Sequence, residues 1–146
     1  MLTNLLTEDR ILVIDDATDW QDAVSRAVSP LIADGTVNES YYNAIIESTH
    51  TNGSYYVLAP GIAMPHARPE TGVNRNGLAF LLVKNGVFFP GEEEAVRLHF
   101  LLAASDSDQH IELITELSEL FCNDEAMAEL FQASVPADVN RVLSRY

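Results

Sequence analysis

The sequence contains four histidines, and their side chains are the candidates for acid–base or nucleophilic chemistry near neutral pH, because imidazole alone has an ordinary pKa between about 5 and 8. His66 stands in the run Pro60-Gly-Ile-Ala-Met-Pro-His-Ala-Arg-Pro69, between two prolines that restrict the backbone and so the directions in which its ring can point. Arg68, two residues later, could steady an anion. Two interpretations stay open: a ring positioned for chemistry, or a loop histidine without a role.

His110 has a different setting, on the apolar face and in the first turn of an expected helix. A ring there could donate a hydrogen bond to an anion, beside free backbone N–H groups and the positive end of the helix dipole. The alternative is a core histidine that bonds to a carbonyl, since buried polar groups usually find partners. His99, inside an apolar strand, and His50, at a helix end, are expected to be structural.

Missing motifs exclude several other kinds of site. The histidines form no H-x-H or H-E-x-x-H pattern, and the single cysteine, Cys122, makes no C-x-x-C pair, so we expect no metal. The sequence has no G-x-S-x-G elbow and no glycine-rich nucleotide loop, so we expect neither a serine nucleophile nor a nucleotide cofactor. Two histidines and an arginine suit a phosphoryl group carried on a ring nitrogen. Cys122 has acidic neighbours and is expected to be a packing residue, not a phosphoryl carrier.

Length and composition limit what else the chain could be. Its 146 residues are enough for one domain, and 47% hydrophobic residues can form a core without disulfides. A net charge of −14 would repel phosphate backbones and anionic lipids, so nucleic acid and membrane surfaces are disfavoured as partners. The first residues lack the basic start of a signal peptide, and no apolar run approaches the roughly 20 residues of a membrane span. We therefore expect a cytoplasmic protein.

The elements that must position these side chains alternate between strand and helix patterns. Asn85-Gly86 predicts a tight hairpin turn between two short strands, and Asp106 with Gln109 predicts a capping box at a helix start. The pattern predicts strands at 10–15, 55–58, 62–64, 78–83, 87–89 and 96–103, and helices at 18–31, 39–50, 107–121, 124–132 and 136–145. The fold class is therefore α/β, a mixed β-sheet flanked by helices on both faces.

The run Gly61-Ile-Ala-Met-Pro-His-Ala-Arg-Pro69 resembles the active-site segment of the fructose/mannitol-type enzyme IIA components of the bacterial phosphoenolpyruvate:sugar phosphotransferase system. The wider stretch from Tyr41-Tyr42 to Glu70 resembles the ascorbate-specific branch more closely. The likeness extends from the helix of Trp20 to the helix of Asp124. It implies one type-2 IIA domain over residues 1–146.

The resemblance also implies a function. The first histidine of such proteins accepts a phosphoryl group from the phosphocarrier HPr and passes it to a cysteine of the cognate enzyme IIB, which links the protein to a membrane IIC. Carried over residue by residue, His66 is the phosphorylated residue and His110 the second active-site histidine. Mannitol and fructose members have an arginine before the active histidine, but none lies between Arg26 and Arg68 here. Arg68 and backbone N–H groups near Asp108 and Gln109 are then the candidates for anion neutralisation.

Three expectations follow for the site and its use. Because His66 and His110 each follow a predicted strand, we expect their rings within a few ångströms of each other. Apolar side chains should surround His66, and the acidic protein should favour a basic face on the donor. The alternative function is a regulatory IIA-like module whose phosphorylation at His66 controls protein binding. A hydrolase is disfavoured, since the sequence gives no base or orienting carboxylate near His66 in the chain. The sugar and the oligomeric state stay open.

Overall fold

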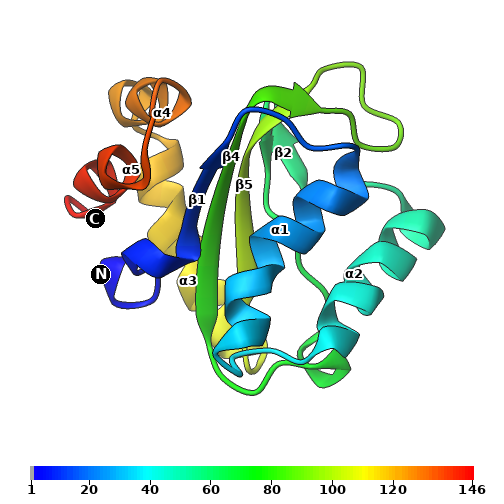
Figure 1. The fold of residues 1–146 in the computed structure, drawn as a ribbon. Coiled ribbons are helices and arrows are strands. Elements are labelled where there is room, and N and C mark those ends of the chain that lie inside the picture. Colours follow the sequence, from blue (N-terminus) through cyan, green and yellow to red (C-terminus); the bar gives the residue numbers. More distant parts are fainter. Residues whose placement is uncertain (1) are drawn as a thin grey trace.

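A five-stranded mixed sheet forms the middle layer of the protein, as a computed structural model of residues 2–146 shows (Figure 1). The strand order is β1-β4-β5-β3-β2. β1 runs parallel to β4 and β3 runs parallel to β5, whereas the β4–β5 and β2–β3 pairs are antiparallel. The strands are β1 (Ile11–Ile14), β2 (Val57–Ala59), β3 (Ile62–Ala63), β4 (Gly77–Val87) and β5 (Val96–Ala103).

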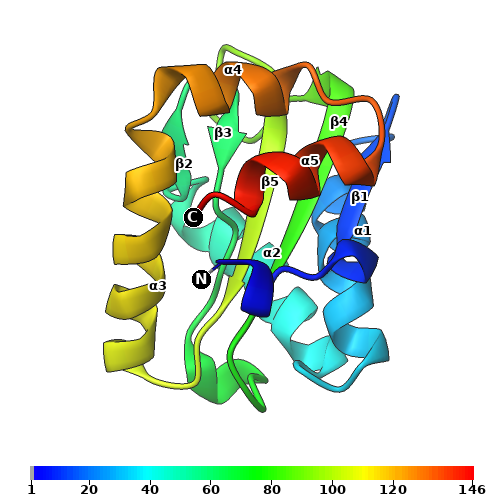
Figure 2. The ribbon, with the colours of Figure 1, turned by 90° about the vertical axis from the view of Figure 1, so that its left-hand side faces the viewer.

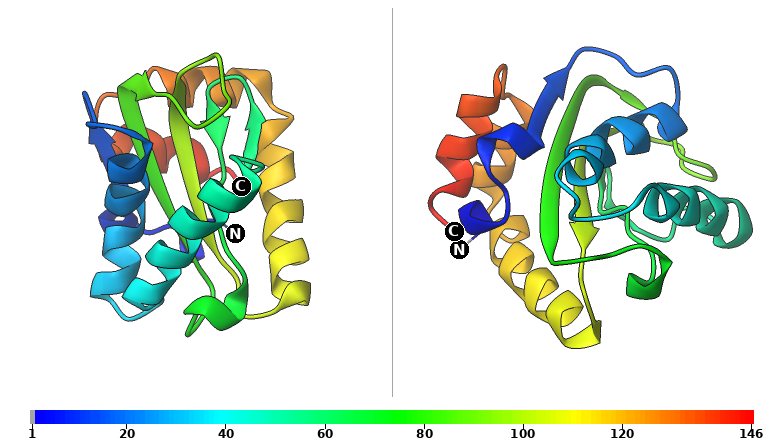
Figure 3. Two further views of the ribbon diagram at one scale, coloured as in Figure 1. Left: turned by 90° about the vertical axis from the view of Figure 1, so that its right-hand side faces the viewer. Right: turned by 60° about the horizontal axis from the view of Figure 1, so that its bottom comes forward.

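Helices cover both faces of the sheet, which confirms the predicted fold class. α1 (Trp20–Ala33) and α2 (Glu39–Asn52) lie on one face, seen from the front in Figure 3. The other face carries α3 (Ser107–Phe121), α4 (Asp124–Phe131) and α5 (Pro136–Leu143), and the two ends of the described chain lie close together there (Figure 2). Three short 3₁₀ turns complete the fold at Leu2–Asn4, Glu8–Arg10 and Pro69–Thr71. Across residues 2–146, each helix is too short or too polar to cross a lipid bilayer.

The two central strands, β4 and β5, are mostly apolar because both of their faces are buried over most of their length. Their side chains alternate between two clusters. Phe80 and Phe100 pack toward α3, α4 and α5, whereas Leu81 and Leu101 pack toward α1 and α2. Burial of each such side chain stabilises the fold by about 1.5–3 kcal/mol, so β4 and β5 form a rigid base for whatever lies at their ends.

The predicted hairpin at Asn85-Gly86 is wrong. β4 continues through both residues to Val87, which pairs with Val96 after a shift in register that begins at Leu82. Gly86 has a φ of 76°, and a Cβ there would lie 2.7 Å from the side chain of Ala95. Asn-Gly therefore marks an irregularity inside a long strand, where only glycine fits, and the chain reverses later, in the loop 88–95.

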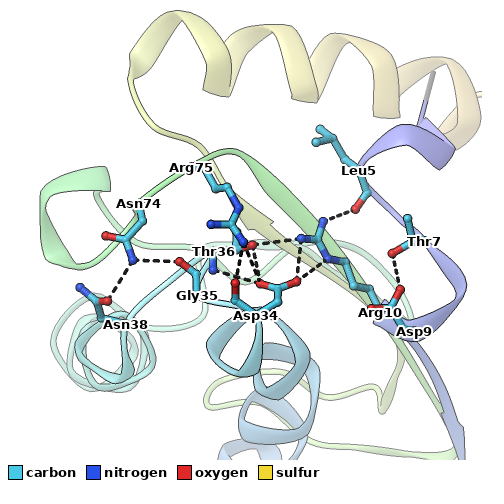
Figure 4. A network of polar contacts seen from close by, with 10 residues as sticks. All are labelled: Leu5, Thr7, Asp9, Arg10, Asp34, Gly35, Thr36, Asn38, Asn74 and Arg75. Atoms are coloured by element: carbon cyan, nitrogen blue, oxygen red, sulfur yellow. Dashed lines mark hydrogen bonds and ion pairs between the residues drawn. The ribbon is translucent and has the colours of Figure 1, made fainter.

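A polar network joins the start of β1 to the loop that leads into β4 (Figure 4). The Arg10 guanidinium donates to the Asp34 carboxylate at 2.8 Å, and the Thr36 hydroxyl donates to the same carboxylate at 2.6 Å. Partial burial raises the pKa of Asp34, but the hydrogen bonds from Thr36 and Arg10 outweigh it and lower the pKa to about 2. The backbone N–H of Asn74 donates to the backbone carbonyl of Thr36 at 2.9 Å. The network thus anchors the segment that ends at Asn76.

Candidate active site

The two histidines singled out from the sequence meet at one edge of the sheet. β3 and β5 are parallel neighbours, so their carboxyl ends lie at the same edge, opposite to the end of β4. His66 follows β3, and His110 lies in the first turn of α3, which follows β5. Their ring centroids are 5.0 Å apart. The expected proximity is observed, and the chemical roles of the two rings remain predictions.

A backbone carbonyl orients the ring of His66. Its Nδ1 lies 2.7 Å from the carbonyl oxygen of Met64, two residues earlier. Since a carbonyl only accepts hydrogen bonds, Nδ1 carries the proton in this geometry, and Nε2 of the neutral ring keeps its lone pair. Burial lowers the pKa of His66, as does the neighbouring His110, although the bond to Met64 acts in the opposite direction. His66 is therefore held as a neutral ring with a free lone pair on Nε2.

Two tyrosines that the sequence did not mark as site residues, Tyr55 and Tyr56, pack against His66. The Tyr55 hydroxyl donates to the His66 carbonyl at 3.1 Å, and its ring meets the imidazole edge-on at 5.6 Å. Tyr56 lies beneath, 6.4 Å from the imidazole, and is buried. The local signal available in the sequence was the pairing of two aromatic residues just before the proline-bounded segment. Tyr55 is half exposed, so it forms part of the outer rim of the site.

A pocket of about 340 Å³ opens over both histidines. Arg68 lines it with an exposed side chain, which belongs to none of the ion pairs found within residues 2–146. Arg68 therefore lies in the pocket that His66 and His110 share, and its role in neutralising an anion stays a prediction. The pocket is lined by Tyr41, Tyr55, His66, Ala67, Arg68, Pro69, Leu102, Ala104, Asp106, Ser107, His110 and Ile111.

The start of α3 departs from expectation. The Asp106 carboxylate caps the helix by accepting the N–H of Gln109 at 2.8 Å, but the Gln109 side chain accepts from Asn76 at 2.8 Å instead of returning to Asp106. The predicted capping box is therefore only half formed. The N–H of Gln109 is also engaged by Asp106, so the prediction that N–H groups near Asp108 and Gln109 neutralise an anion now concerns those of Ser107 and Asp108. Ser107 and Asp108 keep the N–H groups that a helix start leaves without intrahelical partners.

Asn76 connects this helix start to the sheet. Its side-chain oxygen accepts the N–H of Ser105 at 2.8 Å while its amide nitrogen donates to Gln109. Asp106 lines the pocket together with His66. Folding therefore brings a carboxylate close to His66, although the two residues are far apart in the chain. Its oxygen Oδ1 is engaged in capping α3.

The other titratable candidates lie away from the pocket. His99 is fully buried in β5, and burial lowers its pKa to about 4. His50 lies in the last turn of α2, and its ring centroid is 5.5 Å from that of Trp20. Cys122 is exposed, so the prediction that it packs in the core is wrong. It lies two residues beyond Leu120, which places it on the opposite side of α3 from the buried stripe.

Comparison with known proteins shows the family to which the chain belongs. The sequence matches the family described as "Phosphoenolpyruvate-dependent sugar phosphotransferase system, EIIA 2" over residues 4–146. The chain belongs to this family. The "Mannitol-specific cryptic phosphotransferase enzyme IIA component" of Escherichia coli K12 is 42% identical over 144 residues, which cover 99% of this chain and 98% of that protein. Its solution structure has a TM-score of 0.94 and covers 99% of both chains.

Two further relatives of this IIA protein are informative. The ascorbate-specific EIIA component of Shigella boydii is 35% identical over 147 residues, with coverage of 99% of this chain and 96% of that one. The Escherichia coli complex of enzyme IIAMTL and phosphorylated enzyme IIBMTL matches with a TM-score of 0.81 over 94% of this chain and 96% of that chain. At 23% identity that match concerns the fold alone. The resemblance inferred from the His66 segment is thus confirmed at the level of the family.

Proposed function

We propose that this IIA protein carries a phosphoryl group on Nε2 of His66, accepted from HPr and passed to a cysteine of a cognate enzyme IIB. The observation that carries the proposal is the bond of 2.7 Å between Nδ1 of His66 and the Met64 carbonyl, in a pocket shared with His110. That bond reserves Nε2 for the nucleophile, and burial favours the neutral ring.

The proposed step is an in-line displacement. The lone pair of His66 Nε2 forms a bond to phosphorus while the bond from phosphorus to the donor breaks, and the donor keeps that electron pair. His110 donates a hydrogen bond to a phosphoryl oxygen. Arg68 and the first N–H groups of α3 neutralise the remaining charge, as cations and helix starts do at phosphate sites. Transfer to the IIB cysteine repeats this geometry with His66 as the leaving group.

The rim of the pocket supports docking of a protein donor and acceptor. Tyr55 is 50% exposed and Ile111 is 63% exposed, so both present apolar surface at the rim of the pocket. They offer a dry contact that keeps water away from a phosphorylated His66. The net charge of −14 suits partners with a basic face. The ascorbate-specific relative suggests ascorbate or a related sugar as the solute of the cognate transporter, which this protein serves through its choice of IIB.

The test is labelling by phosphoenolpyruvate, enzyme I and HPr, followed by intact mass and peptide mapping. We expect one acid-labile phosphoryl group at His66, lost in His66→Ala. His50→Ala is the matched control, because that histidine is exposed and lies outside the pocket. Addition of IIB should discharge the label. Labelling that survives His66→Ala would overturn the site, and a label that no IIB removes would favour the regulatory alternative.

A further inference from the structure

The segment that carries His66 is held from below by one buried side chain. Tyr41 extends from α2, has no exposed surface, and ends at the loop that follows β3. Its hydroxyl accepts the N–H of Ala67 at 3.1 Å and donates to the carbonyl of Leu102 at 2.6 Å. Ala67 is the residue directly after His66. A single hydroxyl therefore ties this loop to the end of β5.

The same strand residue holds the other side of His66. The N–H of Leu102 donates to the carbonyl of Pro65 at 3.1 Å. The backbone of Leu102 thus contacts the residue before His66 directly and the residue after it through the Tyr41 hydroxyl. Since β5 is buried on both faces, these bonds fix the position of His66 relative to the most rigid part of the fold.

Tyr55 also contacts this loop, but its bond is of a different kind. Its hydroxyl meets the His66 carbonyl from a half-exposed side chain, where water can replace it. The Tyr41 side chain has no exposed surface, and removal of its hydroxyl takes away the hydrogen-bond partner of the Ala67 N–H. Of these two tyrosines, Tyr41 is therefore the one that the loop geometry depends on.

We propose that Tyr41 is a positioning residue, whose hydroxyl holds Ala67 against Leu102 so that His66 keeps its bond to Met64 and presents Nε2 beside His110. The proposal rests on the function proposed above for His66. Loss of the hydroxyl lets the loop shift, which weakens the bond from Nδ1 and allows both ring tautomers. A misplacement of about 1 Å at the reacting atom can reduce a rate by about a hundredfold.

Tyr41→Phe removes the hydroxyl and keeps the ring in its buried place. Tyr42→Phe is the matched control, because Tyr42 is the next residue of α2 and its hydroxyl donates to the Gln21 carbonyl of α1, at 3.4 Å. In single-turnover labelling from phosphorylated HPr, we expect Tyr41→Phe to lower the maximal rate at least tenfold with the half-saturating HPr concentration unchanged. Tyr42→Phe should match the wild type in both quantities.

Two nuclear magnetic resonance readouts separate positioning from general stability. The ring nitrogens of His66 should report a single tautomer protonated on Nδ1 in the wild type and in Tyr42→Phe, and a mixture in Tyr41→Phe. In the wild type, the Ala67 amide should exchange slowly with solvent. This second measurement needs no variant and so holds even if Tyr41→Phe fails to fold. Fast exchange at Ala67, or wild-type labelling and tautomer in Tyr41→Phe, would overturn the proposal.

The outcomes also distinguish the two proposals. If HPr does not label the wild type while the Ala67 amide is protected and the Nδ1 tautomer depends on Tyr41, the phosphocarrier function fails and the positioning role stands. If the wild type is labelled at His66 and Tyr41→Phe behaves identically, the positioning role alone fails.

Discussion

His99 should make the stability of this protein depend on pH between about pH 6.5 and 4, a range that begins above the one in which carboxylates titrate. The side chain is fully buried in β5, its Nδ1 lies 3.2 Å from the Leu81 carbonyl, and its Nε2 has no hydrogen-bond partner within residues 2–146. Phe89 packs against the ring at 5.7 Å. Protonation would place a charge among apolar groups, which is why burial lowers the pKa of His99 to about 4.

The magnitude follows from the two pKa values. Between pH 6.5 and 4 the unfolded chain binds a proton at His99 and the folded state does not, so the free energy of unfolding falls as the pH falls. The difference between an ordinary pKa of about 6.5 and one of about 4 corresponds to about 3 kcal/mol in total. About 2 kcal/mol of this is already lost at pH 5.

Urea denaturation of the wild type and of His99→Leu, followed by circular dichroism between pH 7.5 and 5, measures this contribution. That range stays above the isoelectric point of about 4.4. Leucine is of similar size and cannot be protonated, and all other groups titrate equally in both proteins. The wild type should lose about 2 kcal/mol more than His99→Leu over this range. Parallel pH profiles for the two proteins would show that His99 is not held neutral by the fold.

Three further outcomes are expected. His110→Ala should reduce the rate of His66 labelling by about a hundredfold, because one hydrogen-bond donor to a developing charge is lost; quenched-flow labelling measures this. Its melting temperature should change little, because the His110 ring is only partly buried; thermal denaturation measures this. Asn76→Leu should lower the free energy of unfolding by about 1–3 kcal/mol, since two hydrogen bonds to the start of α3 are removed; an unchanged urea midpoint would contradict this. Cys122→Ser should leave both labelling and delivery to IIB unchanged, because the thiol is exposed at the end of α3 remote from His110; blocked delivery would mean that this thiol takes part.

Local patterns in the sequence were enough for most of the elements. Asp106 was recognisable as a helix cap, and it accepts the expected backbone N–H of Gln109. The apolar runs of β4 and β5 predicted buried strands, and the helical stripe of α3 predicted its packed face. These features depend on residues within a few positions of each other, so periodicity and capping chemistry reveal them.

The same local logic failed where a distant partner decides the structure. Asn85-Gly86 is typical of a hairpin turn, but pairing of Val87 with Val96 extends β4 past it and turns Gly86 into a strand irregularity. At the start of α3, the residue spacing predicted a reciprocal capping box. Asn76, which approaches from the start of β4, takes the Gln109 side chain instead.

The sequence alone identified His66 as the candidate for chemistry, because two prolines and an apolar frame confine it. Only the tertiary structure decided what surrounds that ring. The parallel pairing of β3 with β5 brings His110 within 5.0 Å, and the Met64 carbonyl selects which ring nitrogen is free. Tyr41 reaches the same loop from α2. Apart from the bond to Met64, these contacts join residues far apart in the chain, and burial and strand pairing, which no local pattern encodes, create them.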